Sequence, residues 1–141
     1  MQTMAVRYRV EGVAAALFLC MLCSAQERFE SGDLRGFTKS PTEHIIDERE
    51  RPFKVAAAKG VILDASGVGL GGVLIEVQDK AGRIRGAKTD ANGRFELRGL
   101  LNGSYKFKVT LNGFQSVVGE IIVSRKAQRG EKVTITMKFS V

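Results

Sequence analysis

Asn-Gly turn signals recur every ten residues in the middle of this chain and limit the length of its structural elements. The stretch TDANGRFELRGLLNGSYKFKVTLNGF, from Thr89 to Phe114, contains Asn92-Gly93, Asn102-Gly103 and Asn112-Gly113. Glycine adopts the positive φ that tight turns require, so each pair predicts a change of chain direction. The runs between the turns alternate apolar and polar residues, as strands do when one face meets a core and the other meets water. The ten-residue interval is therefore one short strand plus one turn.

The same alternation predicts seven short strands and no helix over residues 53–141. Tyr105, Phe107 and Val109 face one side of the clearest run. Lys106 and Lys108 face the other side, which is expected to meet water. The remaining runs begin near Val55, Val73, Ile84, Phe95, Phe114 and Val133. Short strands separated by Gly, Asn and Asp turns indicate an antiparallel β-sandwich.

Residues 1–25 have the features of a cleaved, Sec-type secretory signal. Arg7 and Arg9 precede the apolar run Val13–Cys23, and Ala25 offers a small residue at the cleavage point. The run is shorter than the roughly 20 residues of a spanning helix, and an uncleaved anchor is the alternative. Cleavage there removes both cysteines, so the mature chain has no disulfide. Export without disulfides favours a bacterial periplasm or medium over a eukaryotic secretory route.

Residues 26–52 are polar and mixed in charge, without a sustained period, and predict a flexible linker or arm. They carry five Lys/Arg and seven Asp/Glu, whereas residues 53–141 carry fifteen and seven, a net charge of +8. A basic domain attracts lipopolysaccharide, nucleic acid or an acidic partner. Alternatively, the lysines lie on outward strand faces and keep the sheet edges soluble.

The order of these strands and turns resembles that of the carboxypeptidase regulatory-like domain family. The stretch GVILDASGVGLGGVLIEV is similar to the start of the family's motif, which has a Gly-x-Val/Ile strand, an Asp-x-x-Gly turn and a Leu-x-Gly-Val step. Three further patterns of the family follow in the same order: Thr-Asp-x-x-Gly-x-Phe, Leu-x-x-Gly-x-Tyr and Gly-Phe. The turn and core positions of this motif are Asp64, Gly67, Gly72, Asp90, Gly93, Phe95, Gly103, Tyr105, Gly113 and Phe114. Gly69 stands where the family usually has proline, which predicts a looser first loop.

The resemblance covers about Val55 to Val141 and implies a transthyretin-like, Greek-key sandwich of seven antiparallel strands. Such domains are usually non-catalytic companions of peptidases, outer-membrane transporters or adhesins. The resemblance thus implies a secreted or periplasmic binding or structural module whose partner is an envelope or extracellular protein, or a polysaccharide. A fold alone does not determine function, so the residues must be considered separately.

The residues supply no catalytic, metal or cofactor site that can be assembled from the sequence. His44 is the only histidine and lies in the predicted arm, so zinc would need carboxylates alone. Asp90-Ala91-Asn92-Gly93 lacks the ligand set of a calcium loop and is interpreted as an Asx turn. GVGLGG precedes a strand, whereas a dinucleotide fingerprint opens a helix. A small secreted hydrolase or peptidase would require Asp64, Asp90 and His44 to converge.

Tyr105 is where the structural and carbohydrate-binding interpretations differ. Sugar platforms use exposed aromatic rings, yet the chain has no Trp, and alternation turns Tyr105 inward. Its hydroxyl is predicted to bond to a loop backbone, as in a tyrosine corner. Carbohydrate binding stays the alternative through the family analogy. A nucleic-acid partner is not predicted, because the chain is expected to be exported and to lack exposed aromatic residues among its basic ones. The basic residues that could share one sheet face and bind nucleic acid are Arg83, Arg85, Lys88, Arg94, Arg98, Lys106 and Lys108.

Overall fold

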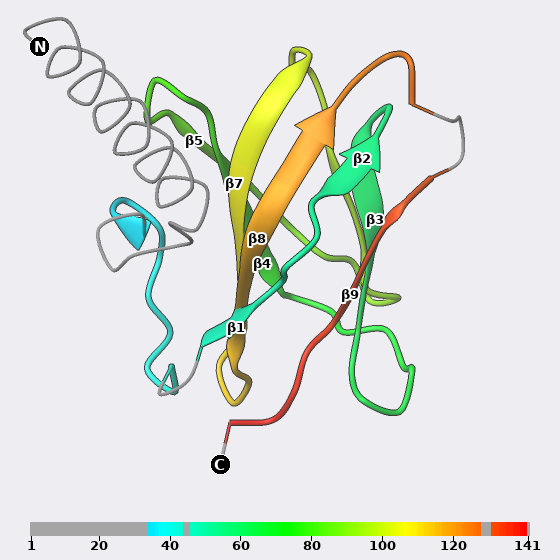
Figure 1. Ribbon diagram of the computed structural model, residues 1–141. Helices are drawn as coiled ribbons and strands as arrows, with labels where there is room; N and C mark the ends of the chain where they lie inside the picture. The colour runs from blue at the N-terminus through cyan, green and yellow to red at the C-terminus, as the bar shows by residue number, and fades with distance from the viewer. Residues whose placement is uncertain (1–33, 44–45, 128–130, 141) are drawn as a thin grey trace, which may run out of the picture. The chain divides into compact units, whose positions relative to one another are not determined.

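The chain forms two β-sheets that enclose one core, as the computed structural model shows (Figure 1). The structure describes residues 34–43, 46–127 and 131–140. The predicted signal peptide of residues 1–25 and His44 lie outside the described residues, so their predictions are untested. Both sheets belong to the compact unit Gly36–Val141.

Nine strands lie in the described residues. They are β1 (Ile46–Glu48), β2 (Phe53–Val55), β3 (Ala58–Leu63), β4 (Leu74–Gln78), β5 (Ile84–Lys88), β6 (Arg94–Leu97), β7 (Gly103–Thr110), β8 (Ser116–Val123) and β9 (Val133–Thr136). The larger sheet has the order β1-β8-β7-β4-β5, and β2 also pairs with β8. The smaller sheet has the order β6-β3-β9. Figure 1 shows β7, β8 and β4 on one side of the fold and β3 with β9 on the other.

The all-β, two-sheet prediction is confirmed, but nine strands replace the predicted seven and their pairing differs in detail. The predicted first strand is divided into β2 and β3, because the chain leaves the larger sheet after Val55 and joins the smaller one at Ala58. Three pairings are parallel rather than antiparallel, since β1 and β2 both run parallel to β8, and β3 runs parallel to β9. The described residues contain no α-helix.

The core lies between the two sheets and is built from alternate residues of each strand. In β4 the side chains of Ile75 and Val77 are buried there, and in β7 those of Phe107 and Val109 are buried opposite them. The largest fully buried apolar side chains of this core are Phe107, Ile62, Ile75, Ile121, Met137, Val55, Val73, Val77, Val109 and Val133. Removing this apolar area from water is the main force that holds the sheets together.

The outer face of the larger sheet is covered by part of the predicted arm. We call residues 37–43 the N-terminal strap. Phe37 is buried at one end, and the Thr38 amide donates a hydrogen bond of 2.9 Å to Glu76 Oε1. Glu43 forms a buried ion pair with Lys108, with Nζ 2.7 Å from Oε1 and 2.9 Å from Oε2. The described part of residues 26–52 therefore contacts the sheet and also supplies β1, which the sequence did not predict.

Lys108 shows why the predicted exposed face is not exposed. It lies between Glu76 of β4 and Val118 of β8 in the paired strands, on the face opposite the core. Its side chain is 1% exposed, although the alternation of β7 predicted that it would meet water. A buried ammonium group requires a counter-charge and hydrogen bonds, which Glu43 supplies. The strap and Lys108 therefore stabilise each other.

Candidate functional site

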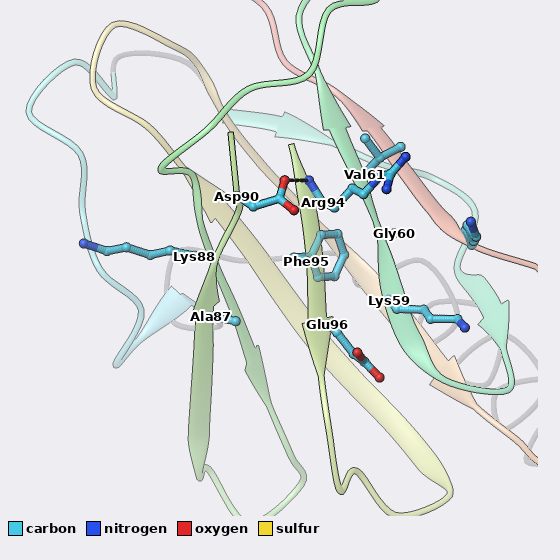
Figure 2. Close-up of a pocket in the computed structure, with 10 residues that line it drawn as sticks. Lys59, Gly60, Val61, Ala87, Lys88, Asp90, Arg94, Phe95 and Glu96 are labelled. Atoms are coloured by element: carbon cyan, nitrogen blue, oxygen red, sulfur yellow. Dashed lines mark hydrogen bonds between the residues drawn. The ribbon is translucent and has the colours of Figure 1, made fainter. Parts of the chain in front are cut away.

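An open groove of about 630 Å³ lies where the outer face of the smaller sheet meets the end of β5 (Figure 2). β3 contributes Lys59 and Val61 to it, and β6 contributes Arg94 and Glu96. The register places Lys59 beside Glu96 and Val61 beside Arg94. Lys132, just before β9, completes the side away from β6. Alternation along the strands points these side chains away from the core, so they form the solvent-facing part of the groove lining.

Positive charge prevails in the groove. Lys59, Arg94 and Lys132 are exposed and have no ion pair with another described residue. Lys88 also lines the groove, but Figure 2 shows its side chain extending away from Lys59. The three unpaired cations can therefore bind an anion without first breaking a contact within the protein.

The two carboxylates that line the groove already have partners. Asp90 Oδ1 accepts hydrogen bonds of 2.9 Å from the amides of Asn92 and Arg94, the latter drawn in Figure 2. Glu96 Oε2 lies 3.5 Å from Nε of Arg98, and both groups are largely exposed. Neither carboxylate forms an ion pair with a groove cation. The groove thus presents uncompensated positive charge.

Asp64 and Asp90 organise turns in the same way. Asp64 Oδ1 accepts hydrogen bonds from the Ser66 hydroxyl at 2.6 Å and from the amides of Ser66 and Val68 at 2.9 and 3.0 Å. The Ser66 hydroxyl and then the Val68 amide lower the pKa of Asp64 below its usual 3.8, because they stabilise the charged form. This geometry agrees with the interpretation of both residues as Asx turns.

The first loop is not looser where glycine replaces proline. Gly69 bridges to Leu63, and the Leu70 amide donates a hydrogen bond of 2.8 Å to the Ile62 carbonyl. A Cβ on Gly69 would collide with the carbonyl of Asn92 in the next turn. Glycine at this position thus allows the two turns to contact each other, which corrects the sequence expectation. Gly93 of that turn has a φ of +79° and is also enclosed by backbone atoms.

Tyr105 has the arrangement that the sequence predicted. Its hydroxyl donates a hydrogen bond of 2.7 Å to the carbonyl of Leu101, and the residue is 8% exposed. Phe95 is buried in the same core. The ring of Tyr105 is therefore unavailable to a sugar.

Phe114, another motif residue, stacks on Phe139, with ring centroids 4.8 Å apart.

Most of the other motif residues lie in turns. Gly67, Gly72 and Gly113 have positive φ in the turns where the sequence predicted them, whereas Gly103 is the first residue of β7. Of the ten motif residues only Asp90 and Phe95 line the groove. The motif residues therefore lie mainly in turns and in the core, and they make only a small contribution to the candidate site.

The seven basic residues that the sequence grouped together do not share one face. Arg94 lies on the smaller sheet, whereas Lys106 and Lys108 lie on the outer face of the larger one. Sequence reasoning missed Lys59 and Lys132 as members of the groove. A signal for Lys132 was available, because it extends the polar side of the alternating run VTITMKF.

The described residues contain no group of three or more His, Cys, Asp or Glu side chains placed to hold a metal ion. In the same part of the chain no helix is long and apolar enough to cross a membrane.

Comparison with protein families finds a match over most of the chain. The profile described as "Carboxypeptidase regulatory-like domain" matches residues 57–138, which is more than half of the chain. A search of curated proteins found no relative.

Comparison with solved structures finds distant similarities. BcpA, the major pilin subunit of Bacillus cereus, is 22% identical with a TM-score of 0.46, over 59% of this chain and 28% of the pilin chain. The 3-chlorocatechol 1,2-dioxygenase of Rhodococcus opacus 1CP is 13% identical with a TM-score of 0.42, over 66% and 63%. The catechol 1,2-dioxygenase of Acinetobacter sp. ADP1 is 15% identical with a TM-score of 0.40, over 92% and 76%. The matched region spans little more than a quarter of the pilin subunit.

Proposed function

Because the chain belongs to the carboxypeptidase regulatory-like domain family, we propose that it is an exported, non-catalytic module that binds an anionic protein or cell-envelope polymer. Members of this family are typically non-catalytic. The observation that carries the proposal is the groove on the smaller sheet, where Lys59, Arg94 and Lys132 stand exposed without ion pairs in the described part of the chain. Complementary charge steers partners to such a surface and selects among them.

The binding proposal is tested with anionic probes and matched variants. Replacing Lys59, Arg94 and Lys132 with Gln should weaken binding of poly-L-glutamate and of a polyuronate about tenfold at low salt. This follows from roughly 0.5 kcal/mol for each exposed charge contact. Binding of the unmodified protein should fall as salt is raised. Isothermal titration calorimetry measures both effects.

The matched control replaces three exposed lysines outside the groove, Lys54, Lys80 and Lys126, with Gln. It makes the same change in net charge, so it should bind nearly as tightly as the unmodified protein. Equal loss in the two triple variants would show that net charge alone governs binding, and the groove would then not be the site.

We also propose that the first 25 residues direct the export of the protein to the periplasm or the extracellular medium of a bacterium. Arg7 and Arg9, the following apolar run and Ala25 are the features that support it. Expression with the intact N-terminus in a bacterial host, followed by cell fractionation and N-terminal sequencing, should give a mature chain that starts at or near Gln26. A chain in the exported fraction that still begins at Met1 would contradict cleavage.

Carbohydrate is a second candidate ligand because an aromatic ring is exposed in the described part of the chain. Phe139 is 62% exposed and stacks on Phe114. The exposed ring of Phe139 presents a flat apolar surface near Gln115. Aromatic faces of this kind contact the apolar faces of sugar rings. A carbohydrate ligand would be favoured if neutral glycans bind the unmodified protein and the groove variants but do not bind the Phe139→Ala variant. Glycan-array binding that is equal in both proteins would exclude Phe139 as a platform.

A further inference from the structure

Two lysines of the groove lie side by side on neighbouring strands. The parallel register pairs Gly60 of β3 with Val133 of β9, so the residues just before them, Lys59 and Lys132, are neighbours as well. Adjacent strands are about 5 Å apart, and paired residues face the same side of a sheet. Both lysine side chains are exposed and line the groove. Like charges at such neighbouring positions repel each other and destabilise a sheet.

No acidic side chain in the described part of the chain forms an ion pair with either lysine. Glu96 flanks Lys59 on β6, but its Oε2 lies 3.5 Å from Nε of Arg98. Glu131 precedes Lys132 along the chain and is exposed, without an ion pair to it. The repulsion between the two ammonium groups is therefore not offset within the described residues, and an anion that contacts both groups would relieve it.

Only side chains are available to a ligand that lies over β3. This strand pairs with β6 on one side and with β9 on the other, so its backbone groups are taken up by the two ladders. A peptide lying over this surface would gain no main-chain hydrogen bonds from β3, in contrast to a peptide that adds to a free sheet edge. Affinity at this position must come from charge, which favours a ligand with its negative charge concentrated in one group.

The phosphate monoester has the charge that matches two adjacent ammonium groups. It carries about −1.5 to −2 charges at pH 7 and has three acceptor oxygens. A carboxylate or a sulfate ester carries a single negative charge, so it neutralises only one of the two lysines. Lysine binds phosphate as a point charge and needs no planar partner. Among these groups the phosphate monoester therefore fits Lys59 and Lys132 best.

We propose that Lys59 and Lys132 together bind a phosphate monoester carried by a cell-envelope polymer. Arg94 lies one strand and two residues from Lys59, roughly 8 Å away along the sheet. Figure 2 shows the side chains of Lys59 and Arg94 extending to the same side of β3 and β6. Arg94 can therefore contact a second anionic group of the same polymer. This inference rests on the proposed function, and it selects a phosphate-bearing polymer over an acidic protein.

The probes are two dextrans of equal length and equal substitution, one with phosphate monoesters and one with sulfate esters. Both groups are tetrahedral, and they differ in charge. Isothermal titration calorimetry in a phosphate-free buffer at pH 7.5 should show the phosphorylated dextran binding at least fivefold more tightly for each ester.

The preference should depend on pH because the phosphate monoester loses its second charge as the pH falls through about 6. At pH 5 the two dextrans should bind within twofold of each other. The charged side chains that face the lysine pair are Arg94 and Glu96 of β6, with Asp90 and Lys88 further along the groove. The sulfated dextran keeps its single charge at both pH values, so it reports any change in the protein itself.

Single variants test whether the two lysines act together. Lys59→Gln and Lys132→Gln should each reduce the preference for phosphate to less than twofold, because one remaining lysine matches one charge. Arg94→Gln should weaken the binding of both dextrans and leave the preference in place. Lys54→Gln, at an exposed position outside the groove, is the matched control and should change neither. Circular dichroism checks that each variant is folded.

The outcomes separate this inference from the proposed function. Equal binding of the two dextrans at pH 7.5 would overturn the phosphate site, and poly-L-glutamate binding that depends on Lys59, Arg94 and Lys132 would still support the anionic groove. A phosphoserine peptide, or inorganic phosphate, that binds as tightly as one ester of the dextran would overturn the polymer as the source of the phosphate. Equal loss of poly-L-glutamate binding in the groove and control triple variants would overturn the proposed function.

Discussion

Replacing Lys108 with Met should destabilise the protein by about 3–5 kcal/mol, because the change leaves buried carboxylates without their cation. Glu43 is the direct partner, with a side chain only 9% exposed. Glu76 lies opposite Lys108 on β4 and is 7% exposed. With Lys108 removed, the two carboxylates would share one face under the strap. Urea unfolding followed by circular dichroism measures the loss as a lower midpoint at an unchanged slope.

Two comparisons test the cause of this loss. Lys108→Met combined with Glu43→Gln should recover most of the stability, since one of the uncompensated charges is then removed. Lys80→Met at an exposed position should change stability by less than about 0.5 kcal/mol. A Lys108→Met protein as stable as the unmodified one would show that the ion pair contributes nothing.

Tyr105→Ala should cost about 3–5 kcal/mol, as expected when a large aromatic side chain is removed from a core. The ring lies among the residues of the main core, and its hydroxyl holds the carbonyl of Leu101. Tyr105→Phe should cost only about 0.5–1.5 kcal/mol, because it removes the hydrogen bond and keeps the ring. Urea unfolding of the two variants separates the contribution of packing from that of the hydroxyl.

The opposite result would favour a different role for this residue. A ligand-binding tyrosine can be removed with little change in stability and a large loss of binding. A Tyr105→Ala protein that unfolds at the same urea concentration as the unmodified protein would therefore refute the structural role.

Much of the sandwich was predictable because the alternation of apolar and polar residues along each strand indicates which side chains are buried. Ile75 and Val77 of β4, and Phe107 and Val109 of β7, alternate with polar residues and are buried as expected. The Asx turns of Asp64 and Asp90 were predictable for the same reason, since their hydrogen bonds are local. Period and turn chemistry are properties of a few neighbouring residues, and a sequence displays them directly.

Features that depend on distant parts of the chain were not predictable from period alone. The change of sheet between Val55 and Ala58 reverses the inward side, so Ile62 faces the core while Val61 faces outward. Lys108 has the sequence context of an exposed residue, and only the strap, 65 positions away, buries it. The groove likewise joins Lys59 to Lys132 through the parallel pairing of β3 with β9. Alternation assigns residues to faces but does not show which faces meet.

The attachment of the N-terminal strap has a consequence for the order of folding. Lys108 pairs with Glu43 across 65 positions, and the Ser140 hydroxyl donates to the Thr42 carbonyl across 98. Contacts with such high contact order form slowly, because a long loop must close before they contribute stability. During synthesis the strap emerges before its partners, Lys108 of β7 and the Ser140 hydroxyl. The outer face of the larger sheet can therefore be completed only when almost the entire domain is out of the ribosome or the export channel.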